Sequence, residues 1–140
     1  MQPIPYLFFS GNCAEAVRFY AGVFGSPEPE IMPFSAMPDD EKAGMPGIPD
    51  DAVMHAAVRV GDGWIFASDD PSGTTPAMAG ASVNVSLPDA DEAKRVFDRL
   101  ADGGEVRMPI EPAFWTPAFG ALTDRYGTRW MIMADAPAPA

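Results

Sequence analysis

The sequence predicts an α+β fold in which two tandem βαβββ modules form a cupped mixed β-sheet with helices on its convex face. One observation is that the same order of elements, a strand, a helix closed by glycine and then further strands, occurs twice in 140 residues. A second is that GWIFASD at residues 63–69 is echoed by RWMIMAD at residues 129–135. A unit of about 70 residues buries too little apolar surface alone. We therefore expect modules 3–70 and 80–135 to make one domain spanning 1–140.

The first module reads as a strand, a helix, a long loop and two more strands. IPYLFFS at residues 4–10 is short, apolar and aromatic, and Gly11 and Asn12 stop it. The next segment, CAEAVRFYAGVFG at residues 13–25, has apolar residues at helical spacing, with Asn12 as the expected N-cap and Gly25 as the stop. AVMHAAVRV and GWIFAS, residues 52–60 and 63–68, are two strands joined by a tight turn at Gly61-Asp62-Gly63.

The loop at residues 26–51 is rich in proline, methionine and acidic residues, and we expect one strand in it near residues 30–34. Loops of this length are usually lids or mobile segments. Its methionines 32, 37 and 45 suit either an adaptable apolar lid or packing against a second chain.

The second module repeats the order. SVNVSLP at residues 82–88 alternates polar and apolar residues, and Asp89 or Asp91 is placed to cap a helix that glycines 103 and 104 end. Strands are expected at residues 105–110, 119–124 and 128–133, with the turn Arg125-Tyr126-Gly127 before the last. The helices match in register, with Glu15, Ala16 and Tyr20 opposite Glu92, Ala93 and Phe97, and the echo makes Trp64 equivalent to Trp130.

Composition excludes several classes of partner. Nearly half of the residues (47%) are hydrophobic, and the net charge of −11 would repel phosphate backbones and anionic lipid surfaces. We therefore expect no nucleic acid and no membrane as partners. No apolar run approaches the length of a membrane span, no secretory signal is evident at the start, and the one cysteine allows no internal disulfide. These features predict a cytoplasmic protein.

Strand alternation predicts which side chains face the hollow side of the sheet. In the strand 52–60, His55, Ala57 and Arg59 would face the hollow, while Met54, Ala56, Val58 and Val60 would face the helices. Farther along the chain, the residues expected to face the hollow are Trp64, Phe66, Ser68, Ser82, Asn84 and Ser86.

Three segments together resemble a known superfamily. PYLFFSGNCAEAVRFYAGVFG, VMHAAVRVGDGWIFASD and FWTPAFGALTDRYGTRWMI are similar to the opening, middle and end of vicinal oxygen chelate proteins (glyoxalase I, bleomycin-resistance proteins and extradiol dioxygenases), and more narrowly of their PhnB-like branch. The resemblance covers residues 3–133. It implies a paired-module fold, a homodimer and a small-molecule ligand. Some members of the branch carry the label 3-demethylubiquinone 3-methyltransferase, but this chain has no glycine-rich adenosylmethionine loop.

The resemblance also implies a divalent metal held by His, Glu or Gln from both modules. The corresponding positions fall near Pro5, Phe66 or Ser68, Ser82 or Val83, and Met131. None is a good ligand for such an ion, and the chain has one histidine. We therefore expect neither a metal site nor a cofactor.

The candidate site residues each have a structural alternative. His55 is the candidate general base, or a histidine hydrogen-bonded across strands. Arg59 is the candidate anion contact, or a partner for one of the many acids. The candidate ligand-binding aromatics are Trp64, Phe66, Trp115, Phe119 and Trp130, and packing is the alternative for the tryptophans, most clearly for Trp64 and Trp130, which recur in both modules.

Three other residues have weaker support for a functional role. Glu111 is a candidate acid or ligand, Asp124 fits a turn former better than a catalytic acid, and Cys13 fits a buried thiol better than a nucleophile.

Three functions remain open from the sequence. The first is metal-independent small-molecule binding in an aromatic-lined pocket, with sequestration as one form. The second is a divalent-metal or His55-assisted lyase or isomerase acting on a vicinal-oxygen substrate. The third is a structural or regulatory dimer without a ligand. Whether the protein is an enzyme is left undecided by the residues.

Overall fold

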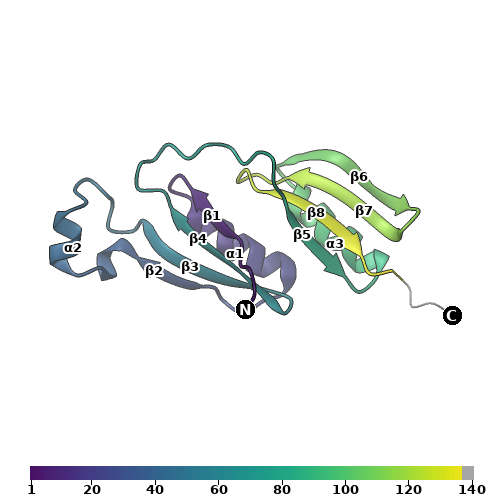
Figure 1. The fold of residues 1–140 in the computed structure, drawn as a ribbon, viewed down its shortest axis with the longest axis horizontal. Helices are drawn as coiled ribbons and strands as arrows, with labels where there is room; N and C mark the ends of the chain where they lie inside the picture. Colours follow the sequence, from purple (N-terminus) through teal and green to yellow (C-terminus); the bar gives the residue numbers. More distant parts are fainter. Residues whose placement is uncertain (137–140) are drawn as a thin grey trace. The chain divides into compact units, whose positions relative to one another are not determined.

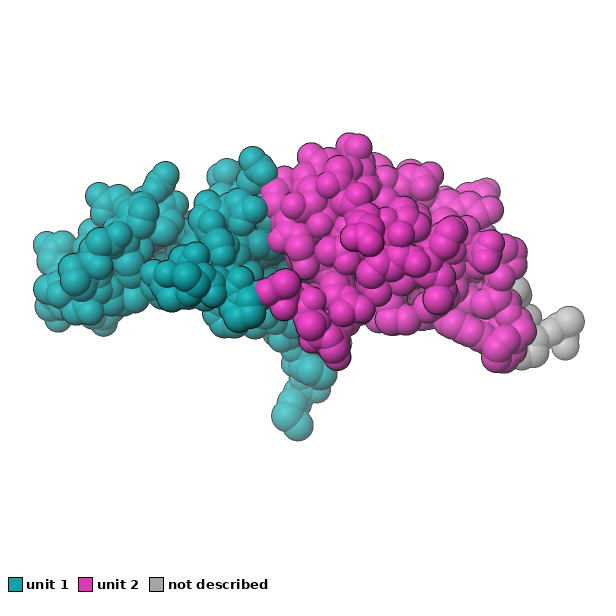
Figure 2. All heavy atoms as spheres, turned by 90° about the horizontal axis from the view of Figure 1, so that it is seen from above, with its two compact units in different colours: residues 1–76 teal, residues 77–140 magenta. Residues whose placement is uncertain are grey.

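The computed structural model describes residues 1–136 and contains two compact units, residues 1–76 and 77–140 (Figures 1 and 2). Each unit is one βαβββ module with its own four-stranded mixed sheet. The α+β class and the tandem modules are therefore confirmed. The strands are hydrogen-bonded as two sheets, one in each unit, where the sequence analysis expected one cupped sheet.

Unit 1 has strand order β1-β4-β3-β2. Its strands are β1 (Tyr6–Phe9), β2 (Glu30–Pro33), β3 (Val53–Val60) and β4 (Gly63–Asp69). β1 runs parallel to β4, and the other neighbours are antiparallel. The helix α1 (Cys13–Phe24) packs against β3 and β4, and it buries Ala16, Val17, Tyr20 and Val23 there (Figure 1).

Unit 2 repeats this topology with strand order β5-β8-β7-β6. Its strands are β5 (Val83–Leu87), β6 (Glu105–Ala113), β7 (Thr116–Thr123) and β8 (Arg129–Ala134). The helix α3 (Ala90–Ala101) packs mainly against β7 and β8, and it buries Ala93, Val96, Phe97 and Leu100 (Figure 1). Asp89 caps α3 by accepting the Glu92 N–H at 2.8 Å, as its sequence position predicted.

The start of α1 differs from the prediction, because Asn12 makes no side-chain capping hydrogen bond. Asp69, at the end of β4, accepts hydrogen bonds from the N–H groups at the start of α1 instead. Its Oδ1 accepts the N–H groups of Gly11 and Cys13, both at 3.0 Å, and its Oδ2 accepts the Val53 N–H at 2.8 Å. One carboxylate thus joins the β1–α1 turn to the first residue of β3.

The long loop contains more structure than expected. The strand predicted near residues 30–34 is present as β2, and a 3₁₀ turn (η1, Phe34–Ala36) and the short helix α2 (Asp39–Ala43) follow it. Residues 34–52, which we call the arm, are tied at their base by the Phe34 and Ser35 N–H groups, which donate to Ala52 and Asp50 at 2.8 and 3.0 Å.

The two units match in detail, but the echo between GWIFASD and RWMIMAD is offset by one residue in space. The Asp70 N–H donates to Phe9, the last residue of β1, and the Asp135 N–H donates to Leu87, the last residue of β5. Asp135 therefore corresponds to Asp70, and Trp130 corresponds to Ile65. The prediction that Trp64 and Trp130 are equivalent is wrong, because the tryptophans lie on opposite faces of their sheets.

Candidate functional site

The sheet of unit 1 has a helix-facing side and an open side. Cross-strand partners lie on the same face of a sheet. Ala56 pairs with Ala67 and Val58 pairs with Ile65, and all four are buried beneath α1. The opposite side, which we call the unit 1 face, carries the paired residues Tyr6, Phe8, His55, Arg59, Trp64 and Phe66. The face assignments made from the sequence for β3 and β4 therefore agree with this register.

The unit 1 face exposes unusually large apolar side chains. Tyr6 is 41% exposed, Phe8 is 56% exposed and Met32, from β2, is 46% exposed. Isolated exposed apolar residues are normal, but neighbouring ones on a sheet face mark a binding or association surface.

His55 belongs to an aromatic cluster on this face, in which Tyr6 contacts the rings of Phe8, His55 and Phe66. The His55 ring centroid is 5.0 Å from that of Phe66 and 5.9 Å from that of Tyr6. The Tyr6 hydroxyl is 3.4 Å from His55 Nδ1, a long hydrogen bond whose donor depends on the imidazole tautomer. This contact occupies Nδ1, and among the described residues none is hydrogen-bonded to Nε2.

Arg59 and Trp64 form a second feature of the unit 1 face. The Arg59 guanidinium carbon lies 5.0 Å from the Trp64 ring centroid, within cation–π range, and Nε donates to the Gly61 carbonyl at 3.2 Å. The pair lines a cavity of about 270 Å³ together with Ala57 and residues 27–30. No carboxylate among the described residues is within salt-bridge distance of Arg59. Glu28 and Glu30 line the same cavity, so the guanidinium is the positive group of a cavity that also carries two carboxylates.

The open side of the unit 2 sheet carries Phe119, paired with Met133 on β8 and with Glu111 on β6. Trp115 stands in the β6–β7 turn, 44% exposed, with its ring centroid 5.1 Å from that of Phe119 in an edge-to-face contact. The structure thus brings Trp115, Phe119 and Glu111 to one region of unit 2.

Trp130 does not join this group. It is fully buried on the helix-facing side, and its indole Nε1 donates to Asp124 Oδ2 at 2.8 Å. Asp124 Oδ1 also accepts the N–H groups of Tyr126 and Thr128, which agrees with its predicted role as a turn former. Trp130 is therefore part of the core, and a ligand could not reach its side chain as the sequence analysis predicted.

Cys13 is fully buried at the start of α1. Burial, followed by the nearby charge of Asp69, raises the pKa of its thiol from 9.0 to about 12. The thiol is therefore neutral at physiological pH, which agrees with the expected buried role and leaves no thiolate nucleophile.

The residues do not fit a divalent metal. In neither unit do three His, Cys, Asp or Glu side chains of the described residues lie close enough together to hold an ion. The positions that the resemblance assigned to ligands are occupied by Pro5, Phe66, Ser68, Ser82, Val83 and Met131, none of which supplies a carboxylate or imidazole.

The residues do not fit adenosylmethionine either. Each strand-to-helix connection is short, Ser10–Asn12 in unit 1 and Pro88–Asp89 in unit 2. N–H groups at the starts of α1 and α3, which could otherwise bind a ligand, already donate to Asp69 and Asp89.

No helix among the described residues has the length and apolar character needed to cross a membrane.

Sequence reasoning missed two parts of the site. Tyr6 and Phe8 were not chosen, although their alternation with Leu7 and Phe9, which are buried, would have placed them on the unit 1 face. A cavity beneath the arm was also missed, because it depends on how residues 34–52 fold over the ends of β3 and β4.

Two tandem βαβββ modules, each with one open sheet face, define the class of fold, and comparisons with known proteins identify the family. A family model described as 3-demethylubiquinone-9 3-methyltransferase matches residues 2–133, so the chain belongs to this family. It is 34% identical to Protein YjdN of Escherichia coli K12 over 134 residues, covering 91% of each chain.

Solved structures of several proteins have the same fold. Protein PA1353 from Pseudomonas aeruginosa is 37% identical, with a TM-score of 0.86 over 98% of this chain and 99% of the other. A PhnB protein from Bacillus cereus is 23% identical, with a TM-score of 0.73 over 96% and 100%. A glyoxalase/bleomycin resistance protein from Albidiferax ferrireducens shares the fold at 14% identity, with a TM-score of 0.59 over 94% and 98%. The expected PhnB-like branch and vicinal oxygen chelate fold are thereby confirmed.

Proposed function

We propose that the protein binds an organic small molecule on its open aromatic sheet faces without the help of a metal ion. The main support is the unit 1 face, where the rings of His55, Tyr6 and Phe66 contact one another. Flat aromatic walls with a few polar groups are typical of sites for planar ligands. The Arg59 guanidinium over Trp64 adds a place for an anionic group. Trp115 and Phe119 offer a comparable aromatic wall in unit 2.

The ligand class that fits is a flat, amphipathic compound with a negatively charged group. Its ring would stack on the aromatic side chains, its anionic group would contact Arg59, and a donor or acceptor would meet His55 Nε2. Binding of this kind serves sequestration as well as transport of a metabolite.

The fluorescent anion 8-anilinonaphthalene-1-sulfonate tests this proposal. In titrations with chelator present, we expect saturable binding that Trp64→Ala weakens about tenfold, because it removes both the ring and the cation–π partner of Arg59. Arg59→Gln should weaken binding about two- to fivefold, as for an exposed ion pair. Replacing the chelator with magnesium or zinc should leave the affinity unchanged.

Unit 2 offers a matched pair of variants for the same titration. Trp115→Ala should reduce binding, whereas Phe114→Ala, the neighbouring and fully exposed residue, should not. Equal binding by the wild type and by Trp64→Ala and Trp115→Ala would rule out these faces, and binding that requires a divalent ion would rule out the metal-free form.

The Tyr6–His55 contact favours a second candidate, acid–base catalysis at His55. With Nδ1 near the tyrosine hydroxyl, Nε2 is the nitrogen available to exchange a proton with a bound substrate. On a vicinal-oxygen substrate this would be a lyase or isomerase reaction. It predicts turnover that His55→Gln abolishes while ligand binding survives; turnover that persists in His55→Gln would contradict it.

A further inference from the structure

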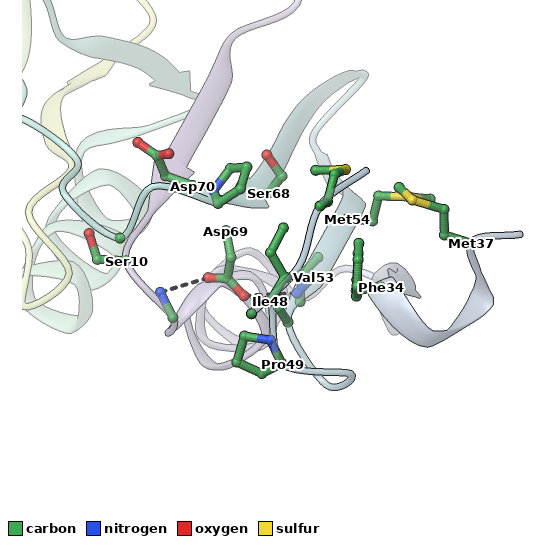
Figure 3. Close-up of a pocket in the computed structure, with 16 residues that line it drawn as sticks. Ser10, Phe34, Met37, Ile48, Pro49, Val53, Met54, Ser68, Asp69 and Asp70 are labelled. Atoms are coloured by element: carbon green, nitrogen blue, oxygen red, sulfur yellow. Dashed lines mark hydrogen bonds between the residues drawn. The ribbon is translucent and has the colours of Figure 1, made fainter. Parts of the chain in front are cut away.

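A separate cavity of about 360 Å³ lies beneath the arm of unit 1 (Figure 3). It is bounded by the arm, by the start of β3 and by the ends of β1 and β4. None of the six residues that define the unit 1 face lines it, but Ser68, the cross-strand partner of Phe8, does, so the cavity adjoins the edge of that face. Its volume falls within the range of about 300–1,000 Å³ typical of small-molecule sites.

The cavity has an apolar end and a polar end. Phe34, Met37 and Met54 gather at one end, and Ser10 and Asp70 lie toward the other (Figure 3). Met45, from the arm, also lines it. Methionine side chains are unbranched and polarisable, so a wall built from three of them adapts to ligands of different shape.

The charge at the polar end is negative. Asp69 and Asp70 both line the cavity, and no lysine or arginine is among its lining residues. Asp69 is committed to three backbone N–H groups. Asp70 Oδ1 accepts the Ser72 hydroxyl and N–H at 2.8 and 2.9 Å, and Oδ2 accepts only the Thr75 hydroxyl, at 3.3 Å.

Asp70 is therefore ionised and still able to bind a cation. The hydrogen bonds from Ser72 and then Thr75 hold the pKa of its carboxyl below the ordinary value. A carboxylate has about four acceptor positions, and the contacts above leave room at Oδ2.

We propose that this cavity is a second binding site, which takes a small cationic amphiphile: an apolar ring or chain lies among the methionines, and an ammonium group lies beside Asp70. The site uses none of the six residues that define the unit 1 face and has the opposite charge preference. Because Asp70 is exposed to water, the apolar body supplies most of the affinity, and the carboxylate discriminates by charge.

A displacement assay with the neutral fluorophore N-phenyl-1-naphthylamine tests the proposal. The full-length protein should bind this probe, and two competitors with the same ring and opposite charge should then differ. We expect 1-naphthylmethylammonium to displace the probe at a concentration about two- to fivefold lower than 1-naphthylacetate does.

Matched variants assign the effect to the cavity. The double variant Met37→Ala with Met45→Ala should weaken probe binding about tenfold or more, because it removes one apolar wall, whereas Phe114→Ala, at a fully exposed residue of the β6–β7 turn, should not. Asp70→Asn should abolish the preference for the cation, whereas Asp98→Asn on α3 should keep it. Circular dichroism spectra that match the wild type establish that the variants are folded.

Three results would overturn the proposal. They are no probe binding by the wild type, an equal or greater effect of the anionic competitor, and loss of probe binding in Trp64→Ala but not in the double methionine variant. The last would place the probe on the unit 1 face, which would support the proposed function while removing this second site.

Discussion

At the scale of single residues, the Asp69 carboxylate joins two segments of unit 1 that are far apart in the sequence. Its two oxygens accept three backbone N–H groups from two separate segments, the β1–α1 turn and the start of β3. Hydrogen bonds to an ionised acceptor are stronger than neutral ones, at about 1.5–3 kcal/mol each. The arrangement fixes the start of α1, although no side chain from the residue just before the helix caps it.

We expect Asp69→Ala to lower the free energy of unfolding by about 3 kcal/mol, because three backbone donors lose their acceptor together. Urea denaturation followed by circular dichroism measures this difference. Asp62→Ala, in the exposed β3–β4 turn, serves as the control and should stay within about 0.5 kcal/mol of the wild type. A loss for Asp69→Ala no larger than that of the control would show that the carboxylate is dispensable.

The residue scale also shows where site prediction from sequence succeeds. The strand period placed His55, Arg59, Trp64 and Phe66 on one face, and their cross-strand pairing agrees. Trp130 was misplaced, because its strand is apolar on both sides and alternation cannot tell one side from the other. The roles of His55, Arg59, Trp64 and Phe66 in binding stay predictions until a ligand is tested.

At the scale of elements, the two helices begin in different ways. Asp89 caps α3 with its own side chain, whereas Asn12 makes no such bond at the start of α1. The strand-to-helix connection in unit 1 is one residue longer, Ser10–Asn12 against Pro88–Asp89, and the donors of the longer turn are met from β4.

This difference predicts unequal effects of the same type of substitution. Asp89→Ala should destabilise the protein by about 1 kcal/mol, the usual value for losing an N-cap. Asn12→Ala, at the corresponding position, should change stability by less than about 0.5 kcal/mol. Chemical denaturation of both variants gives the comparison, and equal losses would contradict the assignment of Asp69 as the acceptor for α1.

Element boundaries were predicted well except where proline obscured the pattern. β6 continues to Ala113 and β7 starts at Thr116, so most of residues 111–118, which lay between the predicted strands 105–110 and 119–124, belong to the two strands of a hairpin. β6 is the edge strand of its sheet, where a residue without an N–H is tolerated because one side needs no partner. Pro109 and Pro112 lie in this strand, and its register shifts three times along β7.

The short helix α2 was missed for a different reason. Five residues are too few to show an amphipathic period, and none of them is buried. The acidic first turn after Pro38 is the signal that would have found it.

At the scale of the whole molecule, each unit leaves one side of its sheet without a covering helix. Met32, Tyr6 and Phe8 are exposed on unit 1, and Met108 and Trp115 are exposed on unit 2. Two copies of the chain would remove part of this apolar surface from water, in keeping with the homodimer that the family resemblance implies.

We therefore predict a dimer in solution. Sedimentation equilibrium at micromolar concentration should give about twice the chain mass of 14.9 kDa. A charge placed in the apolar surface, Phe8→Asp, should shift the equilibrium toward the monomer, and Asp98→Asn on α3 should not. A wild-type mass of one chain at all concentrations would exclude the dimer.

The one-residue offset between the two units determines which residues can be exchanged between them. Copying by sequence similarity puts Trp64 where Trp130 stands, yet the backbone counterpart of Trp130 is Ile65. A chimera joined where the two sequences match would shift one strand by one residue and turn its apolar face toward water. Joining the units with residue 65 matched to residue 130 keeps the apolar face toward the core.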